Sequence, residues 1–511
     1  MRHVLNSASS KALDKFTIAL GNKSEVDLMR NAGRAIAITA ARMVSGDRTK
    51  SILFVCGTGH NGGDGIAAAG FLKRWGYNCT VWTTGDGTDR DATLQTTLSA
   101  ADIDLKLNLK TGDIDWASVD LVVDALLGVG LYTPVRPHIA DLIDEINGHS
   151  KLTLAADVPS GLNSDTGQIM VSAINAAITV TMGYPKLGLL VLDGPDLSGK
   201  IEIADIGFSN HYFDQLKFGQ HQFGRTDFVE LYTPPQRQTY KHQQGKCLVI
   251  AGSLGMTGAA ILSARSTLLS GSGLTTAACP ASLQRIYASA MPELITLPLP
   301  DNEQGLFHPG HVPLIRESLD WCNALVMGPG LSRSPQTMDF IREIIDDLDV
   351  PTILDADGLT PFNGNLDGLN AVRSPLVITP HAREFALLFD HDLQDVKDNP
   401  VGALMEVRNY FHHTVVLKGA PTITLLSTGD IVLNSTGNEG MATAGSGDVL
   451  SGIIGTLLSQ GVRADEAAIM GVWLHGRAGD LARDVVGTAG MTAHEIQEFI
   501  PAALKEFDPP R

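Results

Sequence analysis

The chain of 511 residues has few cysteines and few aromatic side chains. Its five cysteines are Cys56, Cys79, Cys247, Cys279 and Cys322, and no two of them form a Cys-x-x-Cys pair. An odd number of scattered thiols, most of them in apolar stretches, argues against a disulfide framework and predicts buried free thiols in a reducing compartment. Aromatic residues make up only 6% of the chain, whereas 53 residues are glycine. This balance favours helices and sheets packed closely through small residues.

The sequence also lacks a long apolar run and an excess of positive charge. No stretch of about 18 apolar residues occurs, and the N-terminal MRHVLNSASSKALDK has no apolar segment of the secretory type. The formal net charge is −18, which disfavours a nucleic-acid or anionic-membrane surface. We therefore expect a cytoplasmic protein with no nucleic-acid or membrane partner, and we expect it to form a homo-oligomer.

Two segments each combine an apolar strand, a glycine-rich loop and a helical stretch. SILFVC (51–56) precedes GTGHNGGDG and a helix ending at Gly76, and KCLVIAG (246–252) precedes SLGMTG and a helix ending at Gly271. Each segment is typical of the first strand, turn and helix of a parallel sheet. Further strands are predicted at 79–84, 120–126, 152–157 and 177–182, and then at 274–278, 324–328, 352–357, 376–380, 414–419 and 422–426.

The alternation of these strands with helical stretches predicts an α/β protein with two doubly wound domains. The segment around 209–243 is rich in Gln, His, Phe, Tyr and Pro and has no clear periodicity. It is predicted to connect the two domains. We therefore expect a first domain at 1–215, a linker at 216–239 and a second domain at 240–511.

Residues 434–455, NSTGNEGMATAGSGDVLSGIIG, contain the strongest indication of chemistry. Gly440, Gly445 and Gly447 surround one carboxylate, Asp448, just before an apolar helical run. Backbone N–H groups at a helix N-terminus favour an anion, and an aspartate beside them can accept a proton from a substrate hydroxyl. The alternative is a structural loop capped by an aspartate. The many small residues favour the phosphate site.

Four other segments of the second half support this site. LVITPHAREF places His381 and Glu384 directly after a strand, and TVVLKGAPTITLL places Lys418 to Thr422 between two strands. MGPGL and GMTGAAILSA add glycines and exposed amides suited to close approach of a ligand. Each segment alone could be only a helix cap or a hairpin. The prediction of a phosphate site therefore depends on their occurrence together with the GSGD loop.

Polar residues in the first half follow three successive strands. Asn61 lies in the loop GTGHNGGDG (57–65), Asp124 ends the second of these strands, and Asp157 and Ser160 follow the third. Because the carboxyl ends of parallel strands meet at one edge, Asn61, Asp124 and Ser160 are expected to share an oxygen-rich pocket suited to a hard cation. The alternative is that the two aspartates cap turns.

The strings GTGHNGGDG, VVDALLGVG and AADVPSGLNSDTG, which follow LDKFTIALG and LMRNAG in this order, resemble the epimerase domain that repairs hydrated NAD(P)H. The resemblance covers residues 1–215 and indicates a Rossmann-like α/β/α domain. It implies that Asp157 contacts the hydrated dinucleotide, NADHX or NADPHX, and that Asn61, Asp124 and Ser160 bind K⁺. It also implies a substrate site made of Asn61, Gly62, Gly63, Asp64 and Gly65 with Gly128, Val129, Gly130, Leu131, Tyr132, Thr133 and Pro134. The chain departs from the family at His60 and Arg30, where Asn and Glu are usual.

The strings SLGMTGAAILSA, GPGL, TPHAREFALL and GMATAGSGDVLSGI resemble the ADP-dependent NAD(P)HX dehydratase of the ribokinase-like superfamily. The resemblance implies substrate contacts by Ala259, Gly330, His381 and Asp448. It implies that the adenine nucleotide (ADP, then AMP) is bound by Lys418, Gly419, Ala420, Pro421, Thr422 and Gly447. The anion-binding loop described above adds Gly445 to the expected nucleotide site. By similarity to the Asn-x-x-Glu motif of the superfamily, Glu384 is expected to position Mg²⁺ with ADP. Glu439 is a departure, because the family commonly has Pro there.

Together these resemblances predict a bifunctional repair enzyme. Asp448 is expected to accept the proton of the C6 hydroxyl as it attacks the terminal phosphoryl of ADP, after which loss of phosphate restores NAD(P)H. The first domain is expected to interconvert the R and S epimers, with Asp157 as the candidate proton carrier. Two alternatives stay open: a kinase for small alcohols in the second domain, and a dinucleotide-binding module without catalysis in the first.

Overall fold

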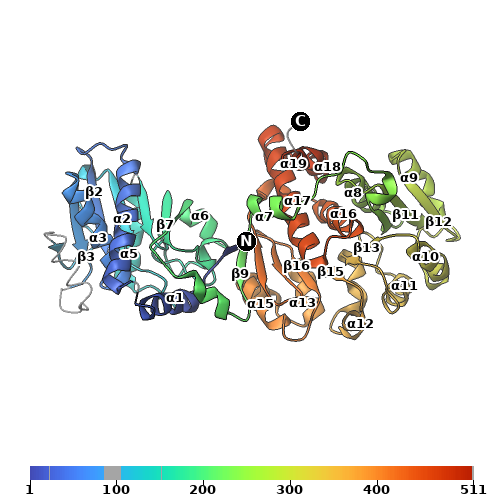
Figure 1. The fold of residues 1–511 in the computed structure, drawn as a ribbon, viewed down its shortest axis with the longest axis horizontal. Coiled ribbons are helices and arrows are strands. Elements are labelled where there is room, and N and C mark those ends of the chain that lie inside the picture. The colour runs from blue at the N-terminus through green and yellow to red at the C-terminus, as the bar shows by residue number, and fades with distance from the viewer. Residues whose placement is uncertain (22, 86–104, 151, 509–511) are drawn as a thin grey trace. The chain divides into compact units, whose positions relative to one another are not determined.

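A computed structural model describes residues 1–21, 23–85, 105–150 and 152–508 (Figure 1). The contacts divide the chain into two compact units, His3–Gly219 and Met1–Arg2 with Gln220–Arg511. The range 216–239, expected to be a linker, contains a strand and a helix of the second unit. The domain boundaries given above remain predictions.

The first unit is built on a seven-stranded parallel sheet with the order β4-β3-β2-β5-β6-β7-β8. Its strands are β2 (Ser51–Cys56), β3 (Asn78–Thr83), β4 (Leu105–Lys106), β5 (Leu121–Ala125), β6 (Thr153–Ala156), β7 (Ile178–Met182) and β8 (Lys200–Ala204). Its helices include α1 (Ser7–Ala19), α2 (Glu25–Met43), α3 (His60–Arg74), α5 (Pro137–His149) and α6 (Gly194–Ser198). The strand order reverses between β2 and β5, so the loops after these two strands open on one crevice.

Alternating side chains of β2 face two separate hydrophobic clusters. Ile52 and Phe54 pack in the cluster that contains Ile36 of α2, whereas Leu53 and Val55 pack in the cluster that contains Ile143 of α5. Successive strand residues point to opposite faces, and both faces are covered by helices. The predicted doubly wound α/β fold is therefore confirmed for this unit.

The second unit contains an eleven-stranded sheet with the order β1-β9-β18-β17-β16-β15-β14-β13-β10-β11-β12. Its strands are β1 (Arg2–His3), β9 (Gln220–Phe223), β10 (Lys246–Ile250), β11 (Leu274–Pro280), β12 (Ile295–Leu299), β13 (Ala324–Met327), β14 (Thr352–Leu354), β15 (Leu376–Ile378), β16 (Thr414–Leu417), β17 (Ile423–Leu425) and β18 (Ile431–Asn434). Strands β10 to β16 pair in parallel, and β17 pairs antiparallel with both β16 and β18. A largely parallel sheet confirms the predicted α/β class here too.

The helices of the second unit lie on both faces of this sheet (Figure 1). They are α7 (Arg225–Leu231), α8 (Thr257–Leu269), α9 (Gln284–Ala290), α10 (Val312–Leu319), α11 (Pro335–Ile345), α12 (Asp367–Ala371), α13 (Ala382–Phe389), α14 (Leu393–Asp398), α15 (Pro400–Val407), α16 (Ser446–Ser459), α17 (Ala464–Val486), α18 (Ala493–Glu498) and α19 (Ile500–Lys505). Helix α16 is buried throughout from Val449 to Ser459. Its Gly455 lets it approach the sheet, because a Cβ there would lie 2.2 Å from Val326 Cγ2. The start of α16, with Asp448, is thus fixed by the core.

The predicted strands all form, although several end one to three residues before the predicted limit. Sequence periodicity missed β1, β4, β8, β9, β12 and β18. Of these, β8 and β12 are edge strands with partly exposed side chains, and β12 contains Pro298, so an apolar pattern is weak in both. Four of the five cysteines are buried and Cys79 is half-buried, all as free thiols. No helix in the described ranges is long and apolar enough to cross a membrane.

Candidate functional site

Three polar residues meet at the carboxyl edge of the first sheet, as the sequence predicted. Ser160 Oγ donates to Asp124 Oδ1 at 2.6 Å, and the Ser160 N–H donates to Asp124 Oδ2 at 2.8 Å. Leu127 joins them, because its N–H donates to Ser160 Oγ and its carbonyl accepts from Asn61 Nδ2, both at 2.8 Å. The strand end of β5 and the loops after β2 and β6 therefore form one polar cluster.

This cluster offers oxygen atoms that could hold a hard cation. Asn61 Oδ1 is buried and has no hydrogen-bond partner among the described residues. Burial raises the pKa of the Asp124 carboxyl to about 6, although Ser160 donors oppose that shift. The described residues contain no group of three His, Cys, Asp or Glu side chains able to hold a metal ion. An ion here would therefore be held by mixed amide, carboxyl, hydroxyl and carbonyl oxygens, which suit a hard cation.

The two predicted substrate loops touch each other through glycines. A Cβ on Gly57 would lie 2.0 Å from the Leu126 carbonyl oxygen, and one on Gly128 would lie 3.1 Å from Asn61 Cβ. Backbone can approach so closely only where side chains are absent. The loop after β2 and the loop after β5 thus form one continuous surface.

A cavity of about 1180 Å³ opens on this surface. Its lining includes, from the predicted substrate set, Asn61, Asp64, Gly128, Val129, Gly130, Leu131, Thr133, Pro134 and Asp157. Of the same set, Gly62, Gly63 and Gly65 are buried within α3 and do not line the described cavity. Tyr132 does not line it either, and its hydroxyl lies 2.6 Å from Ser7 Oγ. The structure therefore gathers most of the predicted set around one space.

Asp157 is held by three donors at the end of β6. Its Oδ1 accepts from Lys186 Nζ at 2.6 Å, from the Met182 N–H at 2.9 Å and from Thr181 Oγ1 at 3.1 Å. Lys186 is 1% exposed, so this ion pair is enclosed by protein. Sequence reasoning missed Lys186; the signal was a lone lysine just after the apolar strand ITVTM.

Asp14 of α1 also lines the cavity and was not predicted. Burial raises the pKa of its carboxyl to about 6, with Lys186 lowering it and Asp157 raising it. Burial likewise raises the pKa of Asp64, and the charges of Asp157 and Asp14 add to that shift. A helix that precedes the sheet by many residues gives no sequence signal that one of its carboxylates faces this cavity.

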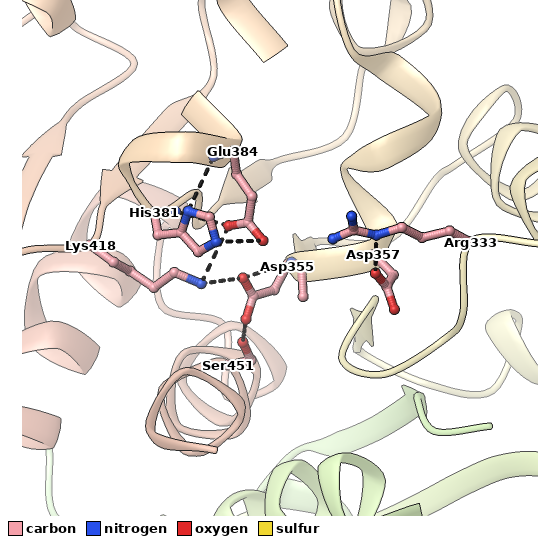
Figure 2. A network of polar contacts seen from close by, with 8 residues as sticks. Arg333, Asp355, Asp357, His381, Glu384, Lys418 and Ser451 are labelled. Atoms are coloured by element: carbon pink, nitrogen blue, oxygen red, sulfur yellow. Dashed lines mark hydrogen bonds and ion pairs between the residues drawn. The ribbon is translucent and has the colours of Figure 1, made fainter. Parts of the chain in front are cut away.

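In the second unit, Asp355 connects two elements of the site (Figure 2). Its Oδ1 accepts from Lys418 Nζ at 2.7 Å, and its Oδ2 accepts from Ser451 Oγ at 2.8 Å. Lys418 Nζ also lies 3.9 Å from Glu384 Oε2. Burial opposes the charge on Lys418, yet the carboxylates of Asp355 and Glu384 raise its pKa above the ordinary value. Asp355 and Ser451 were missed, although Asp355 lies in the predicted strand 352–357 and directly follows the observed strand β14.

His381 and Glu384 form a reciprocal cap at the start of α13 (Figure 2). The Glu384 N–H donates to His381 Nδ1 at 3.1 Å, and the His381 N–H donates to Glu384 Oε2 at 2.9 Å. The two hydrogen bonds form a capping box, in which each side chain accepts from a backbone N–H group at the start of the helix. The pair therefore has the structural role that the sequence left open as an alternative. The His381 ring remains 52% exposed, and the Glu384 carboxylate still faces Lys418.

Asp448 lies in the first turn of α16, whose N-cap Gly445 has φ 87°. A Cβ on Gly447 would lie 3.4 Å from Lys418 Nζ, so the lysine lies next to Gly447 at this helix start. Burial raises the pKa of Asp448 to about 7, with Asp355 adding to the rise and Lys418 opposing it. A carboxylate with this pKa is suited to accept a proton near neutral pH.

The remaining predicted residues lie in loops at strand ends. Gly330 has φ 62°, and a Cβ there would lie 2.9 Å from Ala259 Cβ, so these two predicted substrate contacts are neighbours. Helix α8, which carries Ala259, packs against α16. The predicted nucleotide residues Gly419, Ala420, Pro421 and Thr422 form the turn between β16 and β17. In that turn Thr422 Oγ1 donates to the Gly419 carbonyl at 3.2 Å.

Comparisons with known proteins match both units. A family model described as NAD(P)H-hydrate dehydratase matches residues 247–502, and one described as YjeF-related protein N-terminus matches residues 25–188. The bifunctional NAD(P)H-hydrate repair enzyme Nnr of Moorella thermoacetica is 34% identical over 99% of this chain and 97% of its own length. The protein of the same name from Thermofilum pendens is 33% identical to this chain, and the match covers 95% of this chain and 93% of that protein. A ribokinase-like superfamily protein of Enterococcus faecalis shares the fold with a TM-score of 0.50, at 23% identity over 57% of this chain and 97% of that one.

Proposed function

The chain belongs to the family of bifunctional NAD(P)H-hydrate repair enzymes, and we propose that its two units hold the two active sites. It is an epimerase and a dehydratase of hydrated NAD(P)H. Residues 1–215 are proposed to carry the epimerase and residues 240–511 the dehydratase. The observation that carries the second assignment is Asp448, a carboxylate with a pKa of about 7 at a helix start beside Lys418.

In the dehydratase, Asp448 accepts the proton of the C6 hydroxyl of the S epimer. The oxygen attacks the terminal phosphoryl of ADP, whose charge is stabilised by Lys418 and by the amides of Gly445 and Gly447. Phosphate then leaves with its bonding electrons as the ring nitrogen donates its pair, and loss of the C5 proton restores the double bond. The products are NAD(P)H, AMP and phosphate. Ala259, Gly330 and His381 are proposed to hold the dinucleotide.

The residues fit a magnesium ion bound with the nucleotide. Glu384 offers one carboxylate next to Lys418, and Mg²⁺ commonly binds one or two carboxylates together with substrate phosphates. When bound, the ion would neutralise negative charge on the phosphates. The turn Lys418–Thr422 is proposed to contact the adenine nucleotide.

In the epimerase, the cavity between the loops after β2 and β5 is proposed to hold the damaged dinucleotide. Asp157 is proposed to contact the substrate through Oδ2, because Oδ1 is occupied by three donors. Asn61, Asp124 and Ser160 fit K⁺, since Asn61 Oδ1 lacks a partner among the described residues. When bound, the ion would place positive charge beside the loops that are proposed to hold the dinucleotide.

A single assay tests the function. The purified chain is given a mixture of R and S hydrated NADH with ADP, and the recovery of reduced-nicotinamide absorbance is followed together with AMP and phosphate. Full recovery with stoichiometric AMP is expected. If recovery stops near half while spontaneous epimerisation is slow, the R epimer is not being converted, and the epimerase assignment is wrong. Phosphorylation of another alcohol without recovery would favour the kinase. Repeating the assay with ATP determines the nucleotide preference.

A further inference from the structure

The ionisable side chains that line the cavity of the first unit include Asp14, Asp64, Asp157 and Lys186. Two of them are paired, because Lys186 Nζ lies 2.6 Å from Asp157 Oδ1. Asp14 comes from helix α1, whereas the other three follow strands β2, β6 and β7. The cavity therefore brings a carboxylate from outside the sheet to face the loops that are proposed to bind substrate.

Asp157 is arranged for binding. Three donors fix its Oδ1, and one of them is a fully enclosed ammonium group. Charge-assisted hydrogen bonds of this kind fix the orientation of the carboxylate. Because three donors already occupy Oδ1, Asp157 could take up a proton from a substrate only at Oδ2.

Asp14 has the opposite surroundings. No hydrogen bond from a described residue contributes to its pKa, which burial raises to about 6. The charges that face it are Lys186, Asp157, His60, Glu25 and Asp64, and its own helix adds Lys11 and Lys15 to the cavity wall. A carboxyl group that titrates close to neutral pH exchanges protons efficiently.

We propose that Asp14, and not Asp157, exchanges the proton with the substrate during epimerisation, while Lys186 holds Asp157 as a binding group. The inference rests on the proposed epimerase function of this unit. The Asp14 carboxylate accepts the proton of the C6 hydroxyl while the C6–N1 bond breaks, which leaves an aldehyde at C6 and the bonding pair on N1. The protonated Asp14 delivers the same proton to N1. After rotation about C5–C6 the steps reverse on the other face, so the opposite epimer forms with no net change.

The test is the rate at which pure S hydrated NADH is converted to the R epimer by the full chain without nucleotide, so that dehydration cannot occur. Asp14→Asn is expected to lower kcat by about 100-fold or more, with little change in KM and with loss of the acid limb of the pH profile. Asp14→Glu is expected to recover part of the rate. Asp141→Asn, at an exposed aspartate of α5, is the matched control and is expected to be unchanged.

Stability separates a proton-transfer role from a structural one. Because the folded pKa of Asp14 lies above its ordinary value, the ionised group destabilises the fold at pH values above both. Asp14→Asn is therefore expected to leave Tm at pH 8 unchanged or raised.

The inference is overturned if Asp14→Asn epimerises at close to the wild-type rate, or if only Asp64→Asn or Asp157→Asn abolishes kcat. It is also overturned if Asp14→Asn lowers Tm and Asp14→Glu is inactive. In each case the epimerase assignment stands. A wild-type chain that does not interconvert the epimers overturns the proposed function itself.

Discussion

Lys418 Nζ lies 2.7 Å from Asp355 Oδ1, with the Asp355 side chain 2% exposed and that of Lys418 20% exposed. The pair joins the ends of β14 and β16, and Ser451 ties the same carboxylate to α16. It thereby holds an ammonium group next to Gly447, where the proposed phosphoryl group would bind. A buried ion pair of this kind fixes geometry more than it adds stability.

Removing one partner of this pair should be costly. Asp355→Asn removes the carboxylate that is hydrogen-bonded to the Lys418 ammonium and leaves Glu384 and Asp448 as more distant negative charges. The free energy of unfolding of the second unit should therefore fall by about 3 kcal/mol. Asp339→Asn breaks the exposed pair with Arg342 and should cost less than about 1 kcal/mol. Calorimetry of both variants measures the difference. Equal losses would show that Lys418 does not depend on Asp355.

Dehydration should depend on the ionisation of Asp448. Asp448 must be ionised to accept a proton, and its pKa is raised to about 7 by burial and by Asp355. The kcat/KM for dehydration should therefore be constant at high pH and fall about tenfold per unit below pH 7. In Asp355→Asn the acid limb should move to lower pH, because one cause of the raised pKa is gone. If the acid limb of the profile does not move, a group other than Asp448 causes the fall in kcat/KM.

Asp448→Asn should abolish dehydration, with a loss of about 100-fold or more in kcat, and should leave epimerisation at the wild-type rate. Both rates are measured on the same preparation, one with ADP and one without nucleotide. The epimerase rate serves as the internal control for the amount of chain in the assay. Surviving dehydration in this variant would contradict the proposed chemistry.

The sequence was sufficient to predict which site residues lie together when those residues are at the ends of strands. Asn61, Asp124 and Ser160 could be placed together because parallel strands present their carboxyl ends to one edge. Asp355 follows the same rule, because it comes directly after β14. It is not among the predicted site residues, because residues 352–357 were interpreted as a strand without a role in the site. Asp14 could not be found in this way, because a residue of a preceding helix reaches the cavity only through tertiary packing. Lys186 is similar, since its role depends on a partner in another loop.

Potassium should support epimerisation and not dehydration. If Asn61 Oδ1 is a ligand, replacing K⁺ by tetramethylammonium at constant ionic strength should slow epimerisation, and Asn61→Ala should abolish the difference between the two salts. Tetramethylammonium cannot replace K⁺ at such a site, because its methyl groups prevent oxygen ligands from contacting the charged nitrogen. Initial rates of both reactions in each salt measure the effect. Equal slowing of both reactions would indicate a general salt effect.

Two neighbouring glycines provide the sharpest test of the epimerase loop. A Cβ on Gly57 would lie 2.0 Å from the Leu126 carbonyl oxygen, which is backbone and cannot move aside alone, whereas a Cβ on Gly59 would meet nothing within 4 Å. Gly57→Ala should therefore force the loops after β2 and β5 apart, at a cost of about 1–3 kcal/mol in stability. Gly59 is the N-cap of α3 with φ −91°, so Gly59→Ala should cost less, about 0.5–1 kcal/mol, because alanine is a poorer N-cap than glycine.

Gly57→Ala should raise KM for hydrated NADH and slow epimerisation, because Asn61 and Gly128 would no longer meet, while dehydration by the second unit continues. Gly59→Ala should retain both activities. Steady-state kinetics of the two reactions with each variant decide the matter. If Gly57→Ala epimerises like Gly59→Ala, close contact between these loops is not required, and the substrate site must lie elsewhere in the cavity.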